Sequence, residues 1–354
     1  MIGPVIKPVI GNVISSPVFM KRISVAFAAL MLLAAVLAVA ASVGETAIPV
    51  GTVINTIANH LWDAGHPVDA IDAGIVWNYR LSRAIVAASC GAALAVSGAV
   101  LQALLRNSLA DPYLLGISAG ASTGAVSIVI LGLGAGMLSL SLGAFIGAVA
   151  AFAFVTLLAL QAGRGTGAII LAGIAGSQMF NALTSFIVTK SASAEQARGI
   201  MFWLLGNLSG VRWPDVWLAL PVAIVGLVVC LWHARALDAF TFGRESAASL
   251  GVPVRRVYAV LIAAAAMMTA VMVSIVGSIG FVGLVIPHAA RFFVGTRHGL
   301  VLPLSALIGA LFLVCADVIS RVIVPGQVLP IGVITALVGA PAFALILCHG
   351  RILR

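Results

Sequence analysis

The stretch from Gln102 to Gly120 reads Q-A-L-L-R-N-S-L-A-D-P-Y-L-L-G-I-S-A-G and forms a short polar segment between two long apolar ones. Arg106, Asn107 and Asp111 would be expensive to bury in hydrocarbon, so this segment must lie where the chain leaves a membrane and turns back. Pro112 then begins the next helix, at a position where its missing N–H is tolerated. The stretch therefore predicts two membrane-spanning helices joined by a tight turn.

The composition extends this interpretation to the whole chain. Hydrophobic residues make up 62% of the sequence and charged residues only 8%, whereas a soluble domain carries about 25% charged residues. The net charge is +9, but the 19 Lys and Arg residues are scattered over the sequence with no run longer than two, which excludes a nucleic-acid-binding patch. The four cysteines lie inside apolar runs without a CxxC pair, so neither a disulfide framework nor a metal site is predicted.

Ten apolar runs are long enough, or nearly so, to span a bilayer, which takes about 20 residues. They cover residues 23–43, 81–104, 112–134, 138–161, 167–189, 214–233, 256–275, 280–296, 301–320 and 331–350. The eighth run is short and contains Pro287 and Arg291. We expect one all-α transmembrane domain over residues 1–354, with residues 1–22 as a cytoplasmic tail and both termini on one side.

The distribution of basic residues orients this domain. Thirteen Lys and Arg residues lie on the side of the termini and six on the other, so the positive-inside rule places both termini in the cytoplasm. The inner group is Lys7, Lys21, Arg22, Arg106, Arg164, Arg235, Arg244, Arg255, Arg256, Arg291, Arg297, Arg351 and Arg354. The outer group is Arg80, Arg83, Lys190, Arg198, Arg212 and Arg321.

Small residues are dense within the predicted spans, as in residues 91–98, 116–120 and 143–147. Glycine and alanine spaced three or four residues apart allow helix backbones to approach closely. Close packing of a large bundle explains this pattern, and we assign these glycines no role in substrate binding.

Three connections are long enough to carry a function: the outer segments 44–80 and 190–213, and the inner segment 234–256. Val50 to Trp62 is predicted to be a surface helix. In the inner segment, residues 243–252 predict a short helix that Gly243 opens and Gly251 ends. Its apolar side consists of Ala247, Ala248 and Leu250. Periodicity alone leaves two interpretations open, a docking site for a cytoplasmic partner and a simple surface helix.

Neither the metalloprotease motif HExxH nor a nucleotide-binding P-loop is present, because the sequence contains no HExxH and no GK[ST]. Asp317 is the one acid well inside a predicted span, and Arg321 follows it at i+4, so a local ion pair is expected rather than a proton relay. His288 lies in the motif P-H-A-A-R, where we favour a structural or coupling role over ligation of haem iron. The chain is thus expected to be neither an enzyme nor a transporter with its own energy source.

Several motifs, in order along residues 79–343, together carry a family resemblance. They are Y-R-L-S-R (79–83), G-A-V-L-Q-A-L-L-R-N-S-L-A-D-P-Y-L-L-G-I-S-A-G-A (98–121), L-A-G-I-A (171–175), F-W-L-L-G-N-L-S-G-V-R-W (202–213), G-R-E-S-A-A-S-L-G-V (243–252), G-S-I-G-F-V-G-L-V-I-P-H-A-A-R (277–291), A-D-V-I-S-R (316–321) and L-P-I-G-V-I-T-A-L-V-G-A-P-A-F (329–343). The chain resembles the permease family of bacterial ABC importers for iron chelates and cobalamin.

The resemblance implies a ten-helix subunit of the bacterial inner membrane that forms a homodimer. Two cytoplasmic ATPase subunits, which hold ATP and magnesium, and a periplasmic substrate-binding protein would complete the importer, and this chain itself would bind no cofactor. Arg80, Arg83 and Arg321 match outer arginines that meet acidic residues of the binding protein. The coupling helix that meets the ATPase corresponds to Gly243, Arg244, Glu245, Ala247, Ala248, Leu250, Gly251 and Val252. Arg106, Asn107, Asp111 and Pro112 belong to the family's cytoplasmic loop motif.

Two positions depart from the family pattern, and both lie at the outer mouth. Ser82 replaces the usual proline between the paired arginines, and Val328 replaces the usual glutamate two residues before Pro330. The expected cargo is a ferric siderophore, followed by haem and then a corrinoid. A stand-alone secondary transporter is the rival class, but it would need an ion site within the membrane. A membrane-embedded enzyme would need a cluster of titratable groups that the spans lack.

Overall fold

The fold is a bundle of membrane helices. The computed structural model describes residues 17–44, 46–133, 138–163, 165–191 and 193–349, and these residues form helices and loops without strands. Within them, seven helices are long and apolar enough to cross a membrane, and three shorter apolar helices accompany them. The ten helices correspond one to one to the ten predicted segments, which confirms the fold class.

The ten membrane helices are α2 (Pro17–Ser42), α5 (Ser82–Leu104), α6 (Ile117–Leu131), α7 (Leu140–Gln161), α8 (Thr166–Ser191), α10 (Trp213–Trp232), α13 (Val254–Val276), α14 (Val282–Val294), α15 (His298–Val322) and α16 (Ile331–His349). The connections add α3 (Val50–Trp62), α4 (Ala70–Ile75), η1 (Val76–Leu81), η2 (Pro112–Leu115), α9 (Ala194–Leu204), α11 (Ala234–Phe240) and α12 (Arg244–Ser249). The predicted surface helix is α3, with the same bounds.

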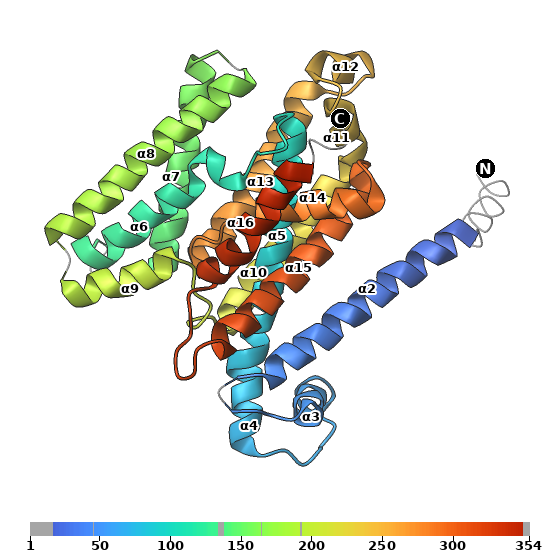
Figure 1. Cartoon of the computed structure of the whole chain (residues 1–354), viewed down its shortest axis with the longest axis vertical. Helices are drawn as coiled ribbons and strands as arrows, with labels where there is room; N and C mark the ends of the chain where they lie inside the picture. The colour runs from blue at the N-terminus through green and yellow to red at the C-terminus, as the bar shows by residue number, and fades with distance from the viewer. Residues whose placement is uncertain (1–16, 45, 134–137, 164, 192, 350–354) are drawn as a thin grey trace, which may run out of the picture.

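The two ends of the molecule differ in what they carry. Helices α11 and α12 lie at one end, and α3 and α4 lie at the other (Figure 1). The start of α2 and the end of α16 both point toward the α11–α12 end, as the predicted topology with both termini inside requires. Residues 1–16 of the predicted cytoplasmic tail lie outside the described residues. Its last residues, 17–22, already belong to α2, which begins at Pro17.

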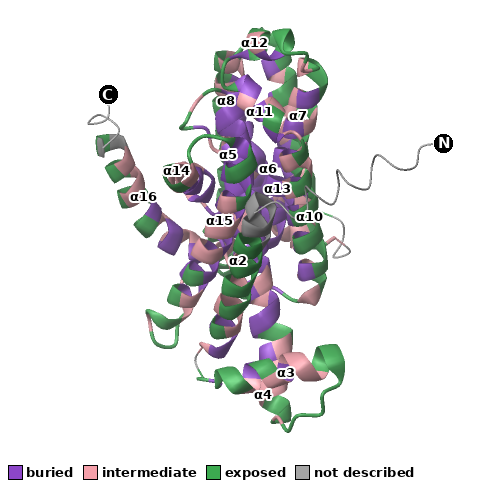
Figure 2. Ribbon diagram, turned by 90° about the vertical axis from the view of Figure 1, so that its right-hand side faces the viewer, coloured by how far each residue is buried: buried purple, intermediate pink, exposed green. Residues whose placement is uncertain are grey.

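Helix α5 is the centre of the bundle, since all but three of its 23 residues are buried (Figure 2). Its glycines permit this position. A Cβ at Gly91 would overlap the backbone carbonyl of Gly309 on α15, and a Cβ at Gly98 would overlap that of Gly283 on α14. The predicted role of small residues in close helix packing is confirmed here, and larger side chains at these crossings would push the helices apart.

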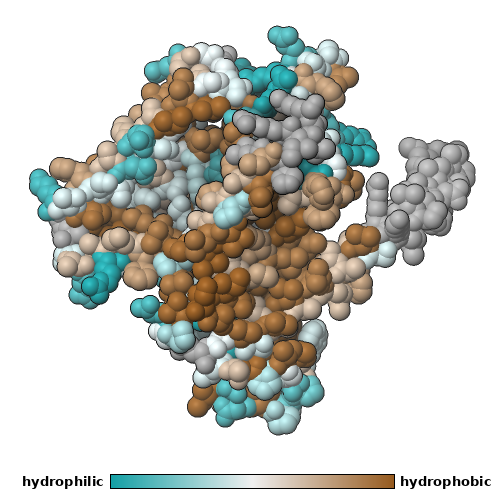
Figure 3. Space-filling view, in the orientation of Figure 1, coloured by the Kyte–Doolittle hydropathy of each residue, from teal (hydrophilic) through white to brown (hydrophobic). Residues whose placement is uncertain are grey.

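Helices α6, α7 and α8 form a second group beside this centre (Figure 1). Gly120 and Gly124 on α6 pack directly against Gly143 and Gly147 on α7, with no room for a Cβ at any of the four. The lateral surface of the bundle is strongly apolar, as Figure 3 shows for one face. Phe27 and Leu30 on α2, for example, are 64% and 66% exposed, which suits contact with lipid.

Three boundaries differ from the prediction. The second membrane helix continues outward through η1 and α4 to Ala70, because the Asp69 side chain accepts hydrogen bonds from the backbone N–H groups of Ile71 and Asp72 and so caps its start. Pro112 begins only the short turn η2, and α6 starts at Ile117 after Gly116, whose φ is +75°. The outer segment 190–213 contains the helix α9, which the sequence analysis did not predict.

Candidate functional site

The outer end contains a buried charge cluster centred on Asp317 of α15. The Arg83 Nε lies 2.7 Å from Asp317 Oδ1, and the Arg321 Nε lies 3.1 Å from Asp317 Oδ2. The Asp317 side chain is only 1% exposed. The predicted pair of Asp317 and Arg321 is therefore present, and the bridge to Arg83 on α5 is an addition that no local sequence pattern signals.

Two of the outer arginines also hold the end of α2. Arg321 donates hydrogen bonds to the carbonyl oxygens of Val43 (2.6 Å) and Ala40 (3.1 Å). Arg80 donates to the carbonyls of Ser42 (2.9 Å) and Thr46 (2.6 Å). The last carbonyls of a helix lack partners within the helix and carry partial negative charge. Arg80 and Arg321 therefore cap the C-terminus of α2 and fix it against α5 and α15.

The structure brings the three predicted docking arginines together, but it buries them. Arg80 is 8% exposed, and the side chains of Arg83 and Arg321 are 12% and 9% exposed. In the single chain the second helix extends outward past both Arg80 and Arg83 to Ala70, so these two arginines do not lie at its outer tip. Contact with a binding protein stays a prediction, and Arg83, which also donates a 3.3 Å bond to the Ser209 hydroxyl, keeps the most exposure of the three.

Aromatic residues form a second outer feature that the sequence analysis missed. The rings of His60 and Trp77 stack with centroids 4.1 Å apart, and those of Trp77 and Trp213 lie 4.7 Å apart. The Trp213 Nε1 donates a 3.0 Å hydrogen bond to the Trp77 carbonyl. These contacts join α3, η1 and α10, so the outer surface helix is attached to the bundle.

The inner end carries the predicted coupling segment as α11 and α12. Gly243 (φ +111°) and Gly251 (φ +81°) flank α12 in backbone conformations that favour glycine, so the predicted helix and both of its boundaries are confirmed. Ala247 is fully buried, whereas Leu250 is 71% exposed. Its neighbours Arg244, Glu245 and Ala248 are exposed as well, and Val252 is half-buried. The predicted apolar side is thus split, with Ala247 facing the protein and Ala248 and Leu250 facing outward.

A polar contact through Asp238 links this segment to α15. Asp238 of α11 accepts hydrogen bonds through Oδ1 from the backbone N–H of His298 (2.8 Å) and from His298 Nδ1 (2.7 Å) at the start of α15. His298 is 2% exposed. The pair links residues 60 positions apart, and the sequence analysis had no signal for it.

The inner turn after α5 lies beside the coupling segment. Arg106 adopts a left-handed conformation (φ +48°), and a Cβ at Gly243 would lie 3.6 Å from Arg106 Nη1. Asn107 Oδ1 accepts from the backbone N–H of Leu109, and Asp111 Oδ1 accepts from that of Tyr113. Although part of Asp111 is accessible to solvent, burial in this crowded turn raises its pKa to about 6, against the lowering effect of the Tyr113 N–H. The predicted turn is confirmed.

Irregular backbone lies at membrane depth where α13 meets α14. With 13 residues, α14 is about 20 Å long, so it starts within the hydrocarbon core of about 30 Å. The carbonyl of Val276, the last residue of α13, accepts a hydrogen bond from Asn207 N (2.8 Å), and Gly206 O accepts one from Ile331 N at the start of α16 (2.9 Å). The end of α13, the loop after α9 and the start of α16 therefore satisfy one another's backbone groups inside the protein, as the absence of water at this depth requires.

Side chains from the inner turn support this meeting of loops. The Tyr113 hydroxyl donates to the carbonyl of Ile279 (2.9 Å) and accepts from its N–H (2.8 Å). Ser118 donates to the Ser278 hydroxyl at 2.9 Å. Phe281 has a φ of +69°, which is strained for a side chain of this size and is typical of functional positions. The short eighth helix is thus a consequence of this junction.

His288, which the sequence analysis considered as a possible haem ligand, has an ordinary structural contact. His288 Nδ1 lies 2.8 Å from the Leu284 carbonyl one turn earlier. Among the described residues, no three His, Cys, Asp or Glu side chains gather closely enough to hold a metal ion.

The structure is a polytopic bundle of membrane helices with an exposed segment at its inner end, an architecture typical of membrane transport permeases. The chain belongs to the FecCD transport family, whose model matches residues 30–349. It is 43% identical over 274 residues to the cobalamin import system permease protein BtuC of Halobacterium salinarum, covering 77% of this chain and 73% of that protein. It is 40% identical over 279 residues to the vitamin B12 import system permease protein BtuC of Escherichia coli, covering 78% and 84%.

A solved structure is also similar. It is described as an inward-facing conformation of a transporter assigned to the metal-chelate type of ABC transporters, with a TM-score of 0.79 and 26% identity over 92% of this chain and 99% of that one. The chain is accordingly a multi-pass permease of the bacterial inner membrane, and the family resemblance drawn from the sequence is confirmed.

Proposed function

We propose that this chain is the transmembrane subunit of an ATP-driven importer whose cargo is a corrinoid. The observation that carries the cargo is the identity of 43% and 40% to two relatives named as cobalamin and vitamin B12 import permeases. These names favour a corrinoid over the ferric siderophore that the sequence analysis ranked first. Haem and siderophore are the alternatives that the same experiment tests.

The proposed assembly is a homodimer with two ATPase subunits inside and a substrate-binding protein outside. Support for the ATPase contact comes from the inner end, where Phe242 and Leu250 are 74% and 71% exposed on a segment outside the membrane. Leu250 borders a groove of about 420 Å³ together with Trp232 and Val252. Exposed apolar side chains beside a groove are typical of a surface that a partner covers.

The cargo can be tested by uptake into proteoliposomes. The full chain, purified with its ATPase and reconstituted with its binding protein, should accumulate labelled cobalamin when ATP is enclosed, and a labelled ferric siderophore or haem far less. Liposomes holding an ATPase variant unable to hydrolyse ATP are the control. Preferred uptake of the siderophore or haem would contradict the corrinoid, and uptake by the permease without the ATPase would support a stand-alone secondary transporter instead.

Docking of the binding protein at Arg83 must be tested with a variant that leaves intact the hydrogen bonds from Arg80 and Arg321 to the end of α2. Charge reversal at Arg80 would place a carboxylate against the carbonyls of Ser42 and Thr46 and would chiefly test folding. Arg83→Gln should weaken association with the binding protein, and association of the unmodified protein should fall as salt rises. Arg198→Gln, at an exposed outer arginine on α9, is the matched control. Equal association of both variants at equal melting temperature would refute docking at Arg83.

A further inference from the structure

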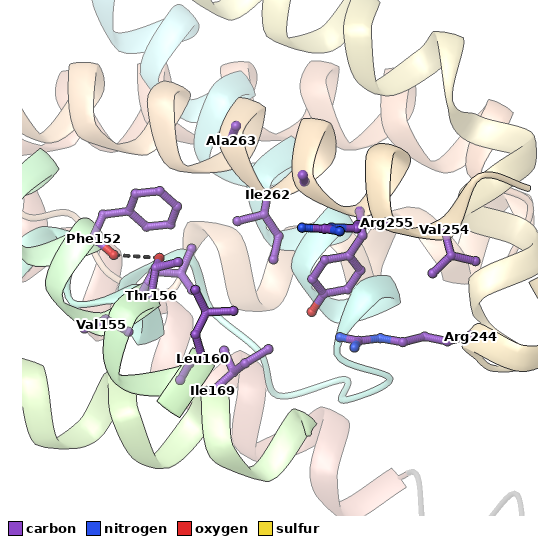
Figure 4. A pocket seen from close by; sticks show the side chains of 14 residues that line it. Phe152, Val155, Thr156, Leu160, Ile169, Arg244, Val254, Arg255, Ile262 and Ala263 are labelled. Atoms are coloured by element: carbon purple, nitrogen blue, oxygen red, sulfur yellow. Dashed lines mark hydrogen bonds between the residues drawn. The ribbon is translucent and has the colours of Figure 1, made fainter. Parts of the chain in front are cut away.

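A cavity of about 650 Å³ opens between α7, the start of α8 and the start of α13 (Figure 4). Most of its wall is apolar and comes from the facing sides of α7 and α13, including Phe152, Val155, Leu160 and Ile262. The one hydroxyl that α7 contributes to the lining, that of Thr156, donates a 2.7 Å bond to the Phe152 carbonyl and is satisfied. The volume lies in the range of sites for small molecules.

The polar groups of the cavity gather at one end. Arg244 and Arg255 lie there, away from Phe152 and Ala263 at the other end (Figure 4). The Arg244 guanidinium lies over the ring of Tyr258, 4.2 Å from its centroid. The buried Tyr258 hydroxyl lies beside the same guanidinium. No acidic residue is among the lining residues, so this end attracts an anion.

The position of the cavity in the membrane follows from the elements around it. Arg244 begins α12, outside the membrane, and Arg255 is the second residue of α13, which enters the membrane from the inner side. From Val254 to Ala263 the lining of α13 descends about 13 Å into the hydrocarbon. Ala259 and Ala263 are exposed in the bundle, so the apolar part opens sideways toward lipid, with the arginines at the level of the inner headgroups.

We propose that this cavity binds an anionic phospholipid of the inner leaflet, with its phosphate between Arg244 and Arg255 and an acyl chain along α7 and α13. Basic pockets between helices on the cytoplasmic side bind anionic headgroups, and arginine is well suited to phosphate oxygens. The long apolar wall fits an acyl chain, which a soluble phosphate compound lacks. The phosphate end would also contact Tyr258 and the first residue of α12.

The test is lipid binding to the purified full chain in mild detergent, counted by native mass spectrometry. Phosphatidylglycerol is the anionic probe and phosphatidylethanolamine the zwitterionic one. Arg255→Gln should weaken phosphatidylglycerol binding about fivefold, the contribution of one basic residue near an anionic leaflet. Arg256→Gln removes the same charge at the neighbouring exposed position, which does not line the cavity, and should leave binding within twofold. Melting temperatures confirm that both variants are folded.

A second set of variants distinguishes the contribution of the acyl chain to binding from that of the headgroup. Ala263→Phe should fill the apolar end and weaken binding, while Val225→Phe, at a membrane-facing position on α10 that is 60% exposed, should not. Glycerol phosphate in excess should fail to displace the lipid. Equal binding to Arg255→Gln and Arg256→Gln, equal binding of the two lipids, or displacement by glycerol phosphate would each overturn the proposal. None of these readouts depends on transport.

Discussion

The two ends of the molecule differ in what they bury and what they expose. At the outer end, Arg80, Arg83 and Arg321 are buried, and their guanidinium groups are engaged by Asp317 and by backbone carbonyls near the end of α2. At the inner end, Phe242 and Leu250 are exposed, and the segment is linked to α15 by a half-buried contact between Asp238 and His298. The outer end is therefore built to hold three helices in fixed positions, whereas the inner end offers a surface.

This difference has an energetic basis. A buried charge is tolerated only when it is paired and hydrogen-bonded, so each outer partner is needed by the others. An exposed leucine contributes little to folding, because its surface stays in water. Substitutions at the outer end should consequently change stability, and substitutions on the exposed inner side should change association with a partner.

Asp317→Asn should have the largest effect on stability. It removes the one negative charge that Arg83 and Arg321 share and leaves two buried cations without compensation. The loss should be about 3–5 kcal/mol, measured as the free energy of unfolding in detergent. Asp63→Asn, at an exposed outer position, is the control and should be neutral, and a similar stability of both variants would refute the central role of Asp317.

Arg321→Lys should have a smaller effect. The lysine keeps a positive charge near Asp317, but its single ammonium group cannot reach the carbonyls of both Ala40 and Val43 as the guanidinium does. We expect a loss of about 1–2 kcal/mol from the lost hydrogen bonds. Arg321→Gln should lose more, because it also removes the ion pair, and a reversed order would show that the cap on α2 matters more than the charge.

Much of the fold could be predicted because hydropathy is a local property. The ten apolar runs, the surface helix Val50–Trp62 and the short helix between Gly243 and Gly251 all appear at the predicted positions. The start of the second helix at Ala70 was missed, because the polar residues around Asn78 and Arg80 lie beyond the apolar run and resemble a loop. Helix α9 was not predicted for the same reason, because its first residues, A-E-Q-A-R, are mostly polar and resemble a loop.

The site could be predicted only in part, because its geometry depends on contacts between distant segments. Arg321 caps residues of α2 that precede it by almost 280 positions, and nothing in the local sequence signals this. The sequence identified Arg80, Arg83 and Arg321 as a set but gave no sign of their contacts with Asp317 and with the end of α2. It also grouped Ala247 with Leu250, although the turn of α12 buries one and exposes the other.

Asp238→Ala should test how firmly the inner segment is held. It removes the acceptor for both the backbone N–H and the ring of His298 and leaves that buried N–H unsatisfied. The stability should fall by about 1–2 kcal/mol, and the ATPase activity of the complex should become less responsive to the binding protein. Asp238→Asn keeps an oxygen acceptor and should lose less, whereas equal losses would assign the effect to charge alone.

Leu250→Asp should have the smallest effect on stability and a decisive one on partner binding. The side chain is 71% exposed, so the free energy of unfolding should change by no more than about 0.5 kcal/mol. A carboxylate at the centre of an apolar docking surface should nevertheless abolish co-purification with the ATPase, and import with it. Ala247→Asp is the matched contrast three positions earlier, since that alanine is fully buried and the new charge should lower the melting temperature as well. If Leu250→Asp retains the ATPase, the exposed face of the inner segment is an ordinary surface, and the docking assignment fails without affecting the account of the outer cluster.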